Sequence, residues 1–142
     1  MILLFCNKIY LKVKNYFINL MTMDYGSPIP TVCTVGSNGQ CDMGKSAIQA
    51  AKNLNSFWNV PFTQIELTPM IGGNDVQNEV FTLANAVTVS SFAVQNKLAG
   101  IHFWSFDRDN DCPRGAASPT CNSYGLGGTL GFTKEFLRSL GL

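Results

Sequence analysis

Charged residues are scarce in this sequence and almost balanced in sign. Ten Lys and Arg residues face nine Asp and Glu residues among 142, so the formal net charge is +1. A chain without an excess of either sign has no strongly basic surface to attract nucleic acid or an anionic membrane. No apolar run is long enough to cross a bilayer. These absences exclude nucleic acid and membranes as expected partners.

Histidine is nearly missing, and so is an export signal. His102 is the single histidine and no two cysteines form a C-x2-C pair, so the sequence predicts no metal site and no cofactor. The apolar run at the start of the chain ends at Cys6 and is followed by Lys8, Lys12 and Lys14. This run is too short for the core of a secretory signal, so no intact signal peptide is expected.

The five cysteines point to disulfides. Cys33 and Cys41 flank one loop rich in Gly, Ser and Asn, and Cys112 and Cys121 flank another. The spacing predicts two local disulfides, each contributing about 2.5 kcal/mol through loop-closure entropy, and leaves Cys6 free. Four reduced thiols are the alternative. If the disulfides form, the intact parent protein is exported to an oxidising, extracellular compartment, which conflicts with the missing signal.

Three short apolar segments have the composition of buried strands. They are rich in β-branched and aromatic residues, are bounded by Gly, Pro or Asp, and cover residues 17–23, 64–71 and 101–106. A helical pattern follows each one, which predicts an α/β fold with parallel, adjacent strands joined by helical crossovers. Because three parallel strands alone would leave open edges, the chain is interpreted as a piece of a larger α/β domain.

The first two helices are predicted from apolar spacing and capping residues. Apolar positions repeat every three or four residues between 43 and 58, with Asp42 as N-cap. A longer helix is predicted over residues 76–97, with Asp75 as N-cap. Residues 1–15 fit neither a strand nor a helix pattern well, although a further strand at residues 9–13 is one interpretation.

A third helix is predicted to begin near Phe132. Thr133 is its expected N-cap, and Phe132 is expected to pack on Leu137 as a hydrophobic staple. The side chains predicted to face the core are Phe136, Leu137 and Leu140.

Polar and aromatic side chains follow the predicted strands where each one ends. For the three strands in turn they are Asp24 and Tyr25; Asn74 and Asp75; and Trp104, Asp107, Arg108 and Asp109. In a βα barrel this end of the strands carries the active site. A structural role is the alternative for each: a turn for Asp24, a helix cap for Asp75 and core burial for Trp104.

Three stretches resemble one enzyme family. Met-Thr-Met-Asp-Tyr-Gly at residues 21–26 resembles the sixth-strand motif of glycoside hydrolase family 18, the chitinases. Residues 68–75 together with 79–83 are similar to the seventh strand and helix, and residues 100–109 are similar to the eighth strand. The resemblance covers residues 16–142 and implies a partial TIM (β/α)8 barrel, about its last three βα units.

The resemblance also implies a substrate and a mechanism. These enzymes hydrolyse β-1,4-linked N-acetylglucosamine polymers with retention, and the substrate's own acetamido oxygen is the nucleophile. By resemblance Asp24 positions the acetamido group, Met21 lies beside the sugar and Trp104 forms the floor beneath it. Chitin or a chito-oligosaccharide is therefore the expected partner. Residues at the possible rim of the site are Tyr25, Asn74 and Asp107.

Two departures from the family pattern matter. The family's general acid is the Glu of an Asp-x-x-Asp-x-Asp-x-Glu motif, which does not occur in these 142 residues. Glu66 is predicted in mid-strand, and Glu79 and Glu135 are predicted in helices on the outside of the barrel. Many members also have Tyr before the sixth-strand acid, where this sequence has Met23.

The chain is therefore predicted to be a truncated piece of a chitinase that is inactive alone. The alternative is a non-catalytic module that binds chitin and self-associates through its open sheet edges. A third hypothesis, phosphate binding by the glycine-rich residues 125–129, is disfavoured because the loop lacks the lysine of a P-loop.

Overall fold

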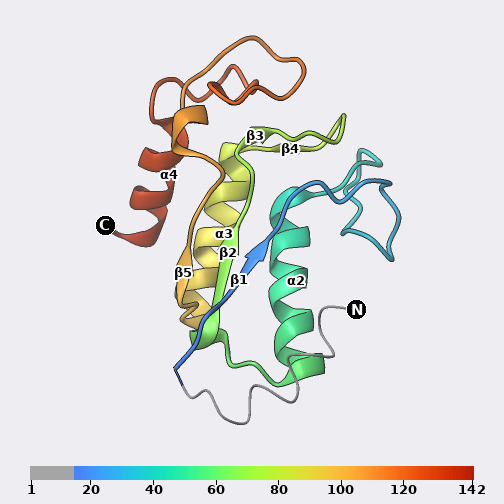
Figure 1. Ribbon diagram of the computed structural model, residues 1–142, viewed down its shortest axis with the longest axis vertical. Coiled ribbons are helices and arrows are strands. Elements are labelled where there is room, and N and C mark those ends of the chain that lie inside the picture. The colour runs from blue at the N-terminus through green and yellow to red at the C-terminus, as the bar shows by residue number, and fades with distance from the viewer. Residues whose placement is uncertain (1–14) are drawn as a thin grey trace.

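The computed structural model describes residues 15–142, which form a mixed α/β arrangement around a parallel sheet (Figure 1). Its strands are β1 (Ile18–Met21), β2 (Ile65–Thr68) and β5 (Gly100–Ile101), in the order β1-β2-β5. Both pairs are parallel, and an isolated parallel bridge between Met70 and Trp104 continues the second pair. The predicted positions, direction and order are confirmed, with strands shorter than predicted. Cys6 and the strand considered at residues 9–13 lie outside the described residues.

Two helices, α2 (Met43–Trp58) and α3 (Leu83–Asn96), lie against one face of the sheet (Figure 1). Ile65 and Leu67 of β2 are fully buried and join the core formed with these helices. The Asp42 carboxylate accepts a hydrogen bond from the Lys45 backbone N–H at 3.0 Å, which confirms the predicted N-cap of α2. In the described part of the chain, no helix has the length and apolarity needed to cross a membrane.

The second predicted helix is wrong in its first third. Residues 72–81 form a hairpin of β3 (Gly72–Gly73) and β4 (Val80–Phe81), and α3 begins only at Leu83. Thr82 is the N-cap rather than Asp75, in a capping box with Asn85. In this hairpin the Phe81 side chain is completely buried, and the Gly73 N–H donates to the Asn122 carbonyl at 2.8 Å.

The C-terminal helix α4 (Gly131–Leu140) packs on α3, and its predicted cap and staple are both wrong. The buried carboxylate of Asp109 accepts the backbone N–H groups of Phe132 and Thr133 at 2.9 and 2.7 Å. Phe132 packs on Phe81 and Tyr124, and Leu137 is 44% exposed instead of facing the core. A carboxylate from a distant loop thus replaces the local Thr133 cap. Two short 3-10 helices, Phe62–Gln64 and Phe106–Arg108, complete the described elements.

Candidate functional site

The structure brings the C-terminal ends of the three parallel strands together at one end of the sheet. The Trp104 backbone N–H donates to the Pro69 carbonyl at 2.8 Å, and the Ile71 N–H donates to the Trp104 carbonyl at 3.0 Å. The Thr22 N–H donates to the Thr68 carbonyl at 3.0 Å. Backbone bonds therefore fix the segments that follow all three strands side by side. The peptide bond between Trp104 and Ser105 is cis.

At this end of the strands, the face of the sheet opposite the helices carries exposed apolar side chains. Met21 is 58% exposed and Trp104 is 52% exposed. Large apolar side chains left exposed on one face are a feature of binding surfaces. Within residues 15–142, Trp104 is therefore not part of the buried core.

Farther along the same face, polar side chains pair between strands. The Thr68 hydroxyl donates to Asn19 Oδ1 at 2.5 Å, and His102 Nε2 lies 3.4 Å from Glu66 Oε2. Glu66 lies in mid-strand, as predicted, and faces its histidine partner.

Asp24 is held where β1 ends. Its backbone has the left-handed φ of 52°, which aspartate tolerates better than most residues. Its Oδ1 accepts the Val76 backbone N–H at 3.1 Å, and its own N–H donates to Asn74 Oδ1 at 3.3 Å. Oδ2 has no hydrogen-bond partner among residues 15–142, so this oxygen is available to a ligand. Asp24 thus bridges to the next loop instead of only making a turn.

Asn74 and Glu79 support this loop from below. Asn74 is buried, and its amide N–H groups donate to the Met70 and Gly72 carbonyls at 3.0 and 3.2 Å. The Glu79 carboxylate, 4% exposed, accepts the backbone N–H groups of Tyr25 and Gly26 at 3.0 and 2.8 Å. The prediction that Glu79 belongs to an outer helix is wrong, because it precedes β4 and binds the loop that carries Asp24.

Burial raises the pKa of two groups in this network. Desolvation raises the pKa of Glu79, and the nearby charge of Asp24 adds to this, while the two backbone N–H donors oppose it. Desolvation also raises the pKa of the Tyr25 hydroxyl, with a smaller contribution from Glu79. The Tyr25 ring packs against the core, and its hydroxyl is buried with no hydrogen-bond partner among the described residues.

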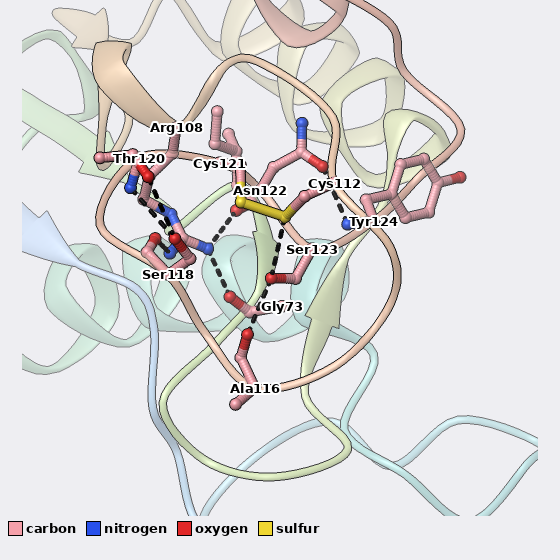
Figure 2. Close-up of a disulfide and its surroundings, with 11 residues drawn as sticks. Gly73, Arg108, Cys112, Ala116, Ser118, Thr120, Cys121, Asn122, Ser123 and Tyr124 are labelled. Atoms are coloured by element: carbon pink, nitrogen blue, oxygen red, sulfur yellow. Dashed lines mark hydrogen bonds between the residues drawn. A yellow bond between two sulfur atoms is a disulfide. The ribbon is translucent and has the colours of Figure 1, made fainter.

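Arg108 is a buried cation bound by backbone carbonyls (Figure 2). It is 1% exposed, and its Nη2 donates to the Ile71 and Gly73 carbonyls at 3.0 and 2.5 Å. Nη1 donates to the Ser118 carbonyl. Burial lowers the pKa of Arg108, and the charges of Asp75 and Asp24 oppose this, so the guanidinium remains protonated. A single arginine between two aspartates just after a strand was the sequence signal for this role.

The two predicted disulfides are confirmed. Cys33 pairs with Cys41 and Cys112 with Cys121, with Cα separations of 5.7 and 5.8 Å. The second one closes the loop that carries Ser118 to Arg108 (Figure 2). Asp107 lies exposed in the short helix after β5. Within residues 15–142, no three His, Cys, Asp or Glu side chains are grouped to hold a metal ion.

This geometry suits the binding of a sugar. An exposed indole and thioether offer apolar area to the C–H face of a pyranose, and a free carboxylate oxygen beside them accepts hydrogen bonds. Glu79 is buried and already accepts two hydrogen bonds, so its carboxyl group is not presented to a ligand at this surface.

Part of the chain is similar in sequence to known proteins. No family model matches the chain. Over 101 residues it is 39% identical to a probable bifunctional chitinase/lysozyme of Escherichia coli (strain K12) and 38% identical to endochitinase 11 of Metarhizium anisopliae. Each match covers 65% of this chain, and it covers 11% and 19% of the two relatives respectively.

Solved structures share the fold. The catalytic domain of a hyperthermophilic chitinase from Pyrococcus furiosus matches with a TM-score of 0.69 and 30% identity. Mutants of active domain 2 of a chitinase from the same organism, complexed with chito-oligosaccharides, match with a TM-score of 0.66 and 30% identity. Both matches cover 88% of this chain and 40% of the solved one. The chain therefore spans well under two thirds of the length of its relatives.

Proposed function

We propose that this chain is part of a chitinase-type glycoside hydrolase, that it forms the last three βα units of a family 18 TIM barrel, and that it holds the substrate there. The similarity to two chitinases in sequence and to chitinase catalytic domains in structure supports this. Trp104 is the floor under one N-acetylglucosamine unit, Met21 contacts the same sugar, and Asp24 positions its acetamido group. The similar chitinase solved with chito-oligosaccharides supports this substrate class.

One observation carries the proposal: Trp104 and Met21 are exposed on the same face of the sheet, next to the loop of Asp24. Trp104 is 52% exposed although its backbone makes two hydrogen bonds to the segment that follows β2. The ring is thus presented by rigid backbone, so binding a sugar costs little ordering entropy. Oδ2 of Asp24 is free to accept a hydrogen bond from an acetamido N–H.

We further propose that this chain alone does not hydrolyse chitin. Of its three glutamates, Glu66 pairs with His102 in mid-strand. Glu79 is buried under the Asp24 loop, and Glu135 pairs with Arg138 on α4. None of them is placed to protonate a leaving oxygen above Trp104. General acid catalysis is typically worth about 10²–10⁴-fold in rate, so its loss is large.

Calorimetric titration with chitotetraose tests the binding role. We expect Trp104→Ala to weaken the affinity by about tenfold or more, because the stacking surface is removed. Phe57→Ala is the matched control, since Phe57 is 75% exposed but lies on α2, near the opposite end of the strands (Figure 1). Equal effects of the two substitutions would contradict the proposal.

Release of a fluorescent aglycone from a labelled chitobioside tests the proposal that this chain alone does not hydrolyse chitin. We expect the purified chain to give no turnover above buffer. Turnover that Asp24→Ala abolishes would show that the chemistry is misassigned.

A non-catalytic carbohydrate-binding role is the second candidate. It is favoured because the exposed sugar-binding surface is present in these residues whereas the Asp-x-x-Asp-x-Asp-x-Glu motif is not. Binding of chitotetraose by the chain without any turnover, retained after Asp24→Ala, would favour this role over a part in catalysis.

Location and assembly belong to the same proposal. The two disulfides support an extracellular location for the intact parent protein. Among the described strands, β1 and β5 each pair on one side only, so the sheet has two open edges. We expect protein consisting of this chain alone to self-associate through them. A monomer in light scattering at high protein concentration would contradict this.

A further inference from the structure

A cavity lies beside the Asp24 loop, between the β3–β4 hairpin and the disulfide-closed loop. Its volume of about 720 Å³ is within the range of about 300–1,000 Å³ typical of small-molecule sites. Neither Trp104 nor Met21 lines it. Six of the residues that do are Asp75, Gln77, Asn78, Val80, Arg114 and Tyr124.

Both walls of this cavity are held by hydrogen bonds. The Gly73 N–H donates to the Asn122 carbonyl at 2.8 Å, and Ser123 Oγ donates to the Ala116 carbonyl at 2.8 Å (Figure 2). Gly72 has a φ of 73°, and a Cβ added there would lie 1.9 Å from the Asn122 carbonyl oxygen. The hairpin therefore approaches the loop as closely as a glycine allows. A ligand would enter a preformed site with little ordering cost.

The lining offers hydrogen-bond donors and acceptors in balance. The side-chain amides of Gln77 and Asn78 make no hydrogen bond with any described residue, and each can both donate and accept. Arg114 lies over the Tyr124 ring at 5.8 Å, and its Nε donates to the Tyr124 carbonyl at 3.2 Å. Its terminal N–H groups make no hydrogen bond to the described residues.

The residues that line the cavity carry charges of both signs. Arg114 is positive and Asp75 negative, and Glu79 is buried at the inner side. A lining that contains one arginine and two carboxyl groups suits neither a phosphate nor a cation. Val80, which is partly exposed, and small residues of the loop add apolar area. This combination suits a neutral ligand rich in hydroxyl and amide groups.

The cavity is joined to the sugar site through Asn74. Asn74 lines the cavity, and its Oδ1 accepts the backbone N–H of Asp24. We propose that the cavity is a second saccharide subsite, which binds N-acetylhexosamine units of the same chain whose other end lies on Trp104. This inference rests on the proposed function, and it adds an extended contact that runs from the end of the sheet to the disulfide loop.

Two-dimensional ¹H–¹⁵N NMR of this chain, titrated with chitotetraose, tests the inference. The side-chain amides of Gln77 and Asn78 report on the cavity, and the indole N–H of Trp104 reports on the first site. We expect all of them to shift with one apparent affinity. Arg114→Ala should weaken that affinity by about tenfold, the effect of losing one charge-assisted hydrogen bond. Gln77→Ala, at an exposed position, should weaken it less and serves if Arg114→Ala disturbs the loop.

Arg138→Ala is the matched control, because Arg138 is an exposed arginine on α4 outside the cavity. Shifts at Trp104 without shifts at Gln77 and Asn78 would overturn the inference and leave the proposed function standing. Shifts at the two amides alone would overturn the role of Trp104 and retain the cavity as a saccharide site. Equal losses in Arg114→Ala and Arg138→Ala, or no shifts at all, would overturn the inference.

Discussion

The proposed sugar-binding surface at the ends of the parallel strands and the buried polar layer near it are built in opposite ways. At this surface, Trp104 and Met21 are more than half exposed, and their side chains make no hydrogen bonds to the described residues. In the buried layer, Arg108, Glu79 and Asn74 are almost completely buried, and each binds two or more backbone groups. Substitutions should therefore separate the two regions: those in the buried layer should lower stability, and those at the exposed surface should lower binding.

Arg108→Met should have the largest effect. The side chain keeps much of its volume but leaves the carbonyls of Ile71, Gly73 and Ser118 without their donor. We expect a loss of about 3–5 kcal/mol in the free energy of unfolding, since each buried group left unpaired costs about 1–3 kcal/mol. Urea unfolding measures it. Arg138→Met, at an exposed position on α4, is the control and should leave the midpoint unchanged. Equal midpoint shifts in Arg108→Met and Arg138→Met would show that this buried position contributes no more to stability than an exposed one.

Replacing Cys112 and Cys121 by serine should come next. The chain-entropy model gives a loss of about 2.5 kcal/mol, and the loop that presents Ser118 to Arg108 would also loosen. Cys33 and Cys41 close a loop of nearly the same length, with a separation of 8 residues against 9. Thermal unfolding of the two double variants should therefore rank the second disulfide above the first. The reverse order would show that the contacts of the second loop add nothing.

Glu79→Gln should change the pH dependence of stability. Because the pKa of Glu79 is higher in the folded state than in the unfolded chain, the folded protein binds this proton more tightly. Its contribution to stability is thus greatest below the unfolded pKa and declines as pH rises toward the folded pKa. Glutamine removes this slope. Because its Nε2 cannot accept a hydrogen bond, it also leaves one of the Tyr25 and Gly26 N–H groups without an acceptor, at a cost of about 1–3 kcal/mol.

Urea unfolding at a series of pH values from about 2.5 to 7 would show the change above the unfolded pKa of about 4.3, and the slope of a carboxyl group with a lowered pKa below it. Glu135→Gln is an informative contrast. The pKa of Glu135 is lowered by its hydrogen bonds to Arg138 and Ser139, so its slope has the opposite sign. An unchanged profile in Glu79→Gln would show that the buried carboxylate does not titrate in this range.

Trp104→Ala should have the smallest effect on stability. A half-exposed ring on an open face contributes little to the fold, and we expect a change of about 0.5 kcal/mol or less. Urea unfolding beside Phe57→Ala checks this. A loss above about 2 kcal/mol would indicate that the indole is part of the core and would weaken its assignment to the sugar site.

Local patterns in the sequence located much of this fold. The three strands, the Asp42 cap of α2 and both disulfides depend on neighbours within a few residues, and all were predictable. The start of α3 was not, because the hairpin before it is held by Asn122, about fifty positions away. The cap of α4 comes from Asp109, 23 residues before Phe132. The support of the Asp24 loop by Glu79 likewise joins residues far apart, and no periodicity reveals such pairs.

Arg108 places a cation of the chain itself at the turn that follows β2. Convergent backbone carbonyls are the ligands with which many proteins bind calcium, whose occupancy varies with the surrounding concentration of the ion. Here a guanidinium that is covalently part of the chain meets the carbonyls of Ile71, Gly73 and Ser118. In a medium of changing salt or in the presence of a chelator, this turn keeps its cation, and the hairpin beside the Asp24 loop keeps its position.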